Sequence, residues 1–184
     1  MNLLRILLFI SSILLFACQN QNQNKIEKSM HAIDFDAKLD SLGIDLPIPS
    51  KPIANYVNIV ESGKLLFLAG KGPKMKNGKY KVGTFGEDLS VEDGYQAAKR
   101  VAELQLGVLK DHLGDLNRVK RIVKVLGLVR SSDEFGNQPE VMNGFSDSMV
   151  AVFGEKGRHA RAAIGTNSLP RNMCIEIEMI VEVY

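Results

Sequence analysis

The clearest pattern of apolar and polar residues lies at the end of the chain, from Cys174 to Tyr184. Apolar residues alternate there with a second set that contains three glutamates. The apolar set is Ile175, Ile177, Met179, Val181 and Val183, and the other set is Cys174, Glu176, Glu178, Ile180, Glu182 and Tyr184. Because successive side chains of a strand point to opposite faces, this alternation predicts a β-strand with one face in a core.

The segment 159–166 comes before this strand, and residues 167–172 (NSLPRN) between them are turn formers. We predict that the two segments pair as a β-hairpin. Directly opposed residues of an antiparallel pair share a face. With Ala162 and Ile164 on the apolar side, Arg161 would therefore lie on the side of the glutamates.

Arg161 would then lie beside a hollow, because the next side chains on its face are only Ala163 and Gly165. Two interpretations remain open at this point. The arginine pairs with a cross-strand glutamate for structural reasons, or it binds a ligand carboxylate through two parallel hydrogen bonds. In the second case a facing glutamate can move a proton or position a water.

The rest of the chain predicts a sheet covered by helices. We expect a short helix over residues 33–42, a hairpin of strands 56–60 and 65–70, an exposed hairpin tip over 74–81, a long helix over 90–113 with a capping box at Ser90, a strand over 119–129, and a second helix from about 139 or 141 to 153. This order predicts an α+β fold with a sheet and two helices packed on one face. The opposite face, with the glutamates, would need a partner.

The composition indicates one globular domain of ordinary kind. The chain has 184 residues, 45% of them hydrophobic and 24% charged, with a net charge of +2. Such a charge gives no reason to expect a nucleic-acid partner. The three histidines, His31, His112 and His159, are far apart in sequence, so we expect no metal site. Cys174 is expected to be a small core residue.

The N-terminus has the pattern of a signal peptide. Arg5 precedes an apolar run over residues 6–16 that is too short to span a bilayer comfortably. Ala17-Cys18 resembles the lipobox of bacterial lipoproteins, which implies lipidation of Cys18; the alternative is a plain secretory signal or an uncleaved anchor. We expect a signal peptide over 1–17, a flexible Gln/Asn-rich tether over 18–31 and a folded domain over 32–184.

The C-terminal motifs resemble those of a known family. Arg161, followed by Leu169-Pro170 and then by the segment 175–178 (IEIE), resembles the signature of the YjgF/Rid family of imine and enamine deaminases. The segments GRHARAAIG and SLPRN are similar to its longer YjgF/chorismate-mutase-like branch, which carries an endoribonuclease label. The resemblance covers about residues 44–184. It implies a chorismate-mutase-like fold, a homotrimer with a ligand cleft at each subunit interface, and no cofactor.

The resemblance also implies an activity, the hydrolysis of small 2-imino or enamine acids to keto acids. Arg161 would bind the substrate carboxylate, and Glu176 would orient the attacking water and transfer its proton. Ala163 would border the hollow beside the arginine. His159, two residues before Arg161, could supply a second titrating group or be a hydrogen-bonded residue of the hairpin.

Tyr56 and Gly70 would form the wall of the cleft. The family's Ser-Gly-Gln segment is replaced here by Ala69-Gly70-Lys71, so Lys71 would either offer a cation to an anionic substrate or be an ordinary solvated lysine. This departure keeps open a non-catalytic function, a membrane-tethered binding protein for small carboxylates. A ribonuclease is the weakest hypothesis. By analogy with bacterial lipoproteins, we expect the protein in the bacterial cell envelope, anchored to the outer membrane on its periplasmic side.

Overall fold

The computed structural model describes residues 33–52 and 54–184. The predicted signal peptide (1–17), the predicted lipidation site Cys18 and the tether (18–31) lie outside the described residues. Within the described part of the chain, no helix is long and apolar enough to cross a membrane. The folded unit extends from Phe35 to Tyr184.

One mixed sheet of five strands forms the centre of this unit, in the order β1-β2-β5-β3-β4. The bounds are Ile59–Ser62 for β1, Leu65–Lys71 for β2, Val119–Arg130 for β3, Ala160–Thr166 for β4 and Ile175–Val183 for β5. Neighbouring strands are antiparallel except β3 and β4, which are parallel. The strand with the strictest alternation, β5, is therefore central, and its apolar side chains are buried.

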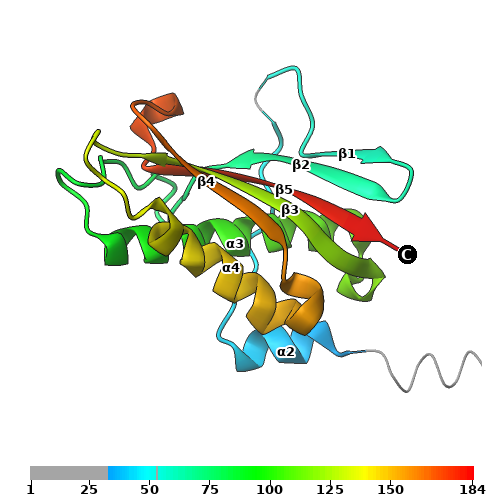
Figure 1. The fold of residues 1–184 in the computed structure, drawn as a ribbon. Helices are drawn as coiled ribbons and strands as arrows, with labels where there is room; N and C mark the ends of the chain where they lie inside the picture. The colour runs from blue at the N-terminus through cyan, green and yellow to red at the C-terminus, as the bar shows by residue number, and fades with distance from the viewer. Residues whose placement is uncertain (1–32, 53) are drawn as a thin grey trace, which may run out of the picture. The chain divides into compact units, whose positions relative to one another are not determined.

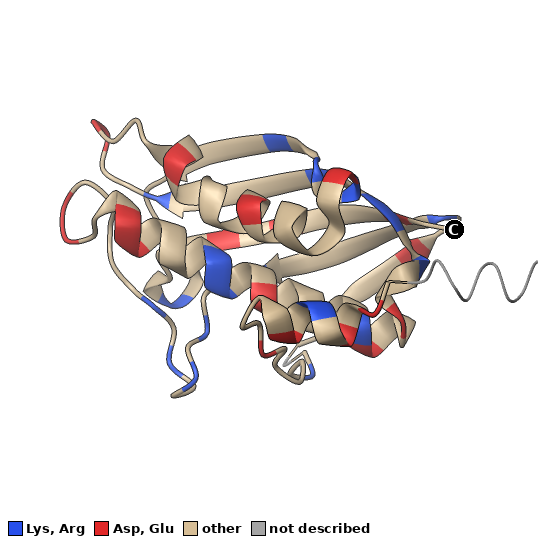
Figure 2. Cartoon of the chain, turned by 90° about the horizontal axis from the view of Figure 1, so that it is seen from below, with Lys and Arg blue, Asp and Glu red and all other residues tan. Residues whose placement is uncertain are grey.

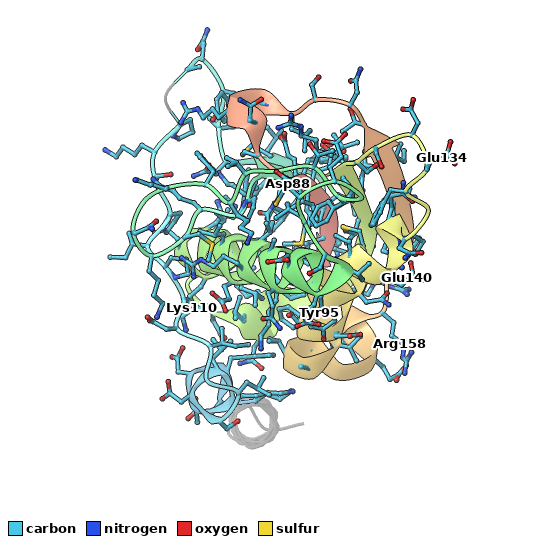
Figure 3. The ribbon with its side chains drawn as sticks, turned by 90° about the vertical axis from the view of Figure 1, so that its left-hand side faces the viewer. Asp88, Tyr95, Lys110, Glu134, Glu140 and Arg158 are labelled. Carbon is cyan, nitrogen blue, oxygen red and sulfur yellow. The ribbon has the colours of Figure 1, made fainter. Side chains whose placement is uncertain are left out.

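Both long helices cover one face of the sheet (Figure 1). The helices are α2 (Phe35–Ser41), α3 (Val91–Leu113) and α4 (Gln138–Phe153). Side chains between the helices and the sheet form one core. Polar contacts also join the helices. Tyr95 Oη of α3 donates to Asp147 Oδ2 of α4 at 3.0 Å, and Lys110 Nζ of α3 donates to Asp36 Oδ1 of α2 at 2.8 Å. Tyr95 and Lys110 are labelled in Figure 3. The predicted α+β fold with two helices on one face is confirmed.

The start of α3 shows how local sequence fixes an element. Ser90 Oγ accepts from the Asp93 backbone N–H at 3.1 Å, and Asp93 Oδ2 accepts from the Ser90 N–H at 3.2 Å, so the predicted capping box is present. The Ser90 hydroxyl, followed by Lys81, lowers the pKa of Asp93 to about 2. Gly114 then ends the helix with φ +73°.

The predicted hairpin between 159–166 and the last strand is wrong. β4 pairs with β3 in parallel, with Arg161 opposite Val125. The physical reason is the order β3, α4, β4, a strand–helix–strand unit in which the helical crossover brings the chain back in the same direction. β5 instead enters between β2 and β3, where both of its edges are hydrogen-bonded.

Arg161 and the glutamates consequently lie on opposite faces of the sheet, against the prediction. Val125 also pairs with the buried Met179, so Arg161 is on the side of the helices. Glu176 pairs with Leu128, and Leu128 pairs with Ile164, so these residues share the outer face. With β3 between them, β4 and β5 are two strand spacings apart, or about 9.5 Å.

The outer face of the sheet leaves apolar side chains in contact with solvent. Val60 pairs with Phe67, and Phe67 pairs with Ile180, which gives an apolar row across three strands. Phe67 is 41% exposed and Ile164 on the same face is 48% exposed. Charges of both signs are distributed along the helices on the opposite face (Figure 2).

Candidate active site

A β-bulge near the end of β2 creates the local geometry of the site. Leu68 pairs with Met179 and Lys71 with Ile177, so three steps along β2 match two along β5. Gln105, a buried residue of α3, donates from Nε2 to the Ala69 carbonyl at 3.0 Å and to the Ile177 carbonyl at 2.9 Å. The helix therefore holds the irregular end of the strand in place.

A cavity of about 410 Å³ lies beside this bulge, within the range of about 300–1,000 Å³ that is typical of small-molecule pockets. Four of the residues predicted from the sequence line it together, namely Tyr56, Gly70, Lys71 and Glu176. The Pro-rich segment before β1, the loop after β2, helix α3 and the segment before β5 complete the lining. A hollow of about 530 Å³ beside α2 is larger, but its lysine, Lys110, is already paired with Asp36.

Glu176 supplies the acidic side chain of this cavity. Burial raises the pKa of its carboxyl group, and the charge of Glu178 raises it further. Among the described residues, no hydrogen-bond donor or cation is paired with it. Gly70 makes room for the carboxyl group, because a Cβ at that position would overlap Glu176 Oε1. An unpaired carboxyl group with a raised pKa in a cavity is suited to general acid–base chemistry.

Lys71 is half-buried in the cavity wall. Its Nζ donates to Asn58 Oδ1 at 2.5 Å, which orients the ammonium group and leaves two of its three donors for other partners. Burial lowers the pKa of Lys71. Of the two interpretations of this residue, the structure therefore supports an oriented cation in the cavity rather than a solvated lysine.

Arg171 is a lining residue that the sequence analysis did not identify. It lies in the turn Pro170–Asn172, and its guanidinium carbon is 5.7 Å from the centre of the Tyr80 ring, a second unpredicted lining residue. Both Arg171 and Asn172 have φ +57°, which is uncommon for residues other than glycine. The family-like segment SLPRN contains Arg171 and could have drawn attention to it. The left-handed backbone that brings Arg171 to the cavity cannot be read from the sequence.

Arg161 does not line the Glu176 cavity of its own chain. It lies against α4, where its Nη1 donates to Asn143 Oδ1 at 3.0 Å and to Ser146 Oγ at 3.0 Å. Ala163, two residues on, lies opposite Gly127 and packs against the core, so it is also outside that cavity. Within one chain, Arg161 and Glu176 therefore form no common site.

His159 belongs to the same network as Arg161. Its Nδ1 is 2.7 Å from the Gly157 carbonyl, and its Nε2 is 3.1 Å from Ser146 Oγ. Because a carbonyl accepts only, Nδ1 carries the proton, and Nε2 accepts from the serine. Burial is the main cause that lowers the pKa of His159. His159 is therefore a hydrogen-bonded residue, which was one of its two predicted roles. Its neutral ring accepts from Ser146, which also accepts from Arg161.

Cys174 is fully buried next to β5, as expected of a core residue. Burial raises the pKa of its thiol to about 12, so the thiolate is disfavoured at neutral pH. Among the described residues, no group of three or more His, Cys, Asp or Glu side chains could hold a metal ion.

These features define an α+β protein of the chorismate-mutase-like class with a small-molecule cavity at a strand bulge. Residues 36–183 match the family described as "YjgF/chorismate_mutase-like, putative endoribonuclease", and the chain belongs to this family. The predicted family is therefore confirmed.

Several proteins are similar to this chain. Protein TCP17 of Trypanosoma cruzi is 43% identical over 147 residues, which are 79% of this chain and 92% of that protein. A protein named 2-iminobutanoate/2-iminopropanoate deaminase from Dermatophagoides farinae is 25% identical over 139 residues, 75% of this chain and 93% of that protein. The crystal structure of Atu1372, of unknown function, from Agrobacterium tumefaciens has a TM-score of 0.76 and 41% identity, covering 82% and 92% of the two chains.

Proposed function

We propose that this protein hydrolyses small 2-imino or enamine acids to keto acids, with release of ammonia, at a site that two copies of the chain complete. The observation that carries the proposal is the Glu176 carboxyl group, unpaired and with a raised pKa, in a cavity shared with Tyr56, Gly70 and Lys71. The similarity to a protein named as an imine deaminase supports the reaction class.

In the proposed reaction, Glu176 accepts a proton from a water molecule while the water oxygen bonds to the imine carbon. The substrate is the protonated imine, so this addition gives a carbon that carries one hydroxyl and one amino group. Glu176 then returns its proton to the nitrogen, the carbon–nitrogen bond breaks and ammonia leaves, while the hydroxyl group gives its proton to Glu176 and becomes the carbonyl group. Positioning and one acid–base group are the main requirements of this chemistry. Tyr56 and the backbone of Gly70 form the wall that confines the substrate.

The carboxylate of the substrate would be bound by Arg161 of a neighbouring copy. Its hydrogen bonds to Asn143 and Ser146 both use Nη1, so they leave the other donors of the guanidinium group for a ligand. The apolar row of the outer sheet face, with Phe67 and Ile180, provides a surface that a second copy would cover. A homotrimer, as the family resemblance implies, would repeat this contact around one axis.

We further propose that residues 1–17 direct the protein to the cell envelope and that Cys18 is lipidated, with the folded unit on the periplasmic side of the outer membrane. The support is the sequence pattern of the leader. In that location a non-catalytic binding protein for small carboxylates is the competing function. The cation of Lys71 in the cavity, in place of the family's glutamine, favours this alternative.

Ammonia release separates the two functions. An amino-acid oxidase would generate the imine, and the purified full-length protein should accelerate its decay. Arg161→Ala should lose this activity, whereas Arg158→Ala, a change at an exposed arginine paired with Glu155 (Figure 3), should retain it. No acceleration by the unmodified protein would refute the enzymatic proposal. Calorimetric binding of a keto acid without turnover would support the binding protein.

A further inference from the structure

The cavity around Glu176 contains more positive charge than one carboxylate requires. Four cationic side chains line it, namely Lys51, Lys71, Lys74 and Arg171. None of them forms an ion pair with a carboxylate of the described residues. Elsewhere in the same part of the chain, lysines do form such pairs, for example Lys81 with Asp93 at 2.9 Å and Lys120 with Glu182 at 2.7 Å.

The surroundings of two of these cations point to a ligand site. Asn58 orients the ammonium group of Lys71, and the half-buried position limits how far water can solvate it. Arg171 is exposed, with its guanidinium carbon 5.7 Å from the centre of the Tyr80 ring, and it lies in a turn in which two successive non-glycine residues have φ +57°. Left-handed backbone at such residues costs free energy and is concentrated at ligand sites. Lys71 is therefore positioned before any ligand arrives, and the turn carries Arg171 at the wall of the same cavity.

We infer that the cavity selects 2-imino acids whose side chain carries a second carboxylate. The inference rests on the proposed function, in which Arg161 of a neighbouring copy binds the first carboxylate. Lys71 and Arg171 would bind the second one through charge-assisted hydrogen bonds, and Lys51 and Lys74 would add attraction at the rim.

The charge balance explains the preference. With a monocarboxylate bound, the cations of the cavity would lose water without gaining an anionic partner, which is costly for a half-buried ammonium group. A dianionic ligand supplies that partner, and among the described residues that line the cavity only Glu176 contributes a carboxyl group to oppose it. The same argument predicts that added salt weakens the dicarboxylate more than the monocarboxylate.

Equilibrium binding of stable keto acids tests the inference independently of turnover. Calorimetry on the purified full-length protein would compare 2-oxoglutarate with 2-oxopentanoate, which has the same number of carbons and one carboxylate. We expect 2-oxoglutarate to bind about tenfold more tightly, as one additional charge-assisted hydrogen bond would give. Arg171→Gln and Lys71→Gln should each remove most of this preference, and Arg171→Lys should retain part of it.

Lys79→Gln is the matched control, because Lys79 lies in the same loop as Lys74 and does not line the cavity. It should leave the ratio of the two affinities unchanged. The inference would be overturned by equal affinities for the two keto acids or by no binding of either. It would also be overturned if Lys79→Gln lost as much of the preference for 2-oxoglutarate as Lys71→Gln. If the 2-imino acids that correspond to these two keto acids were hydrolysed at the same rate, the inference would be overturned while the proposed function stands. Selective 2-oxoglutarate binding without any turnover would refute the proposed function and leave the selectivity in place.

Discussion

Two polar regions of this molecule differ in how their charges are satisfied. Around Arg161, side chains from β4 and α4 are hydrogen-bonded to one another, with Ser146 joined to both Arg161 and His159. Around the bulge of β2, Glu176 and Arg171 have no ion-pair partner among the described residues. The first region holds one arginine in a fixed orientation, whereas the second leaves charges for a ligand. We propose on this basis that the two regions are parts of one site in an assembly of copies.

The largest effect is expected from Glu176→Gln, which keeps the shape of the cavity and removes its acid–base group. Activity, measured as ammonia release, should fall by about 10² to 10⁴, the usual contribution of such a group. The matched control is Glu134→Gln, because Glu134 is exposed in the loop before α4 and lies outside the cavity. An equal loss in both variants would show that the cavity has no special role.

Gly70→Ala should reduce the activity by up to about 100-fold, because the added Cβ would displace the Glu176 carboxyl group and misplaced catalytic groups lose rate steeply. The control is Gly136→Ala, where a Cβ meets no atom within 4 Å. Circular dichroism and the melting temperature would verify that both variants are folded. Full activity of Gly70→Ala would contradict the assigned position of the carboxyl group.

A smaller effect is expected in the Arg161 region. Ser146→Ala would leave His159 Nε2 without its donor and remove one hydrogen bond from Arg161, at a cost of about 1 kcal/mol in the free energy of unfolding. Chemical denaturation would measure the loss, and KM should rise more than kcat falls because Arg161 is less well oriented. Ser41→Ala in α2, whose hydroxyl donates to the Lys38 carbonyl at the exposed surface, is the control and should change neither KM nor kcat. An unchanged stability and KM in Ser146→Ala would show that the network does not position the arginine.

The smallest effect is a gain in stability. Because the folded pKa of Glu176 is raised above its usual 4.5, ionisation of this residue disfavours the folded state once the pH rises above that value. Glu176→Gln removes the penalty, so at pH 7 it should be more stable by about 0.5 kcal/mol, a small amount because water screens a half-exposed group. The difference between the variants should vanish near pH 4. A loss of stability at pH 7 would mean that the carboxylate has a favourable partner.

Most of the fold could be predicted from the sequence, because the spacing of apolar residues and the residues that begin and end each helix indicated the same elements. The capping box at Ser90, the 23 residues of α3 and the alternation of β5 could all be predicted. It also identified Tyr56, Gly70, Lys71 and Glu176, which the structure brings to one cavity.

The position of β4 could not be obtained from local pattern alone. The turn-forming segment 167–172 is equally compatible with a hairpin and with a longer connection, and only the β3–α4–β4 crossover selects parallel pairing. That choice decides which face Arg161 occupies. Arg171 was missed for a related reason, because its place in the cavity depends on a left-handed backbone that no residue type demands there.

The central claim, that Arg161 of one copy and Glu176 of another form one site, is tested most directly by mixing inactive variants. Co-expressed Arg161→Ala and Glu176→Gln chains with different tags would be purified as mixed oligomers and assayed for ammonia release. If each site of a homotrimer takes one residue from each of two neighbouring copies, every mixed trimer has one intact site of three. The purified mixed oligomers should therefore regain about a third of the unmodified activity. Mixed oligomers that remain as inactive as either variant alone would contradict the claim.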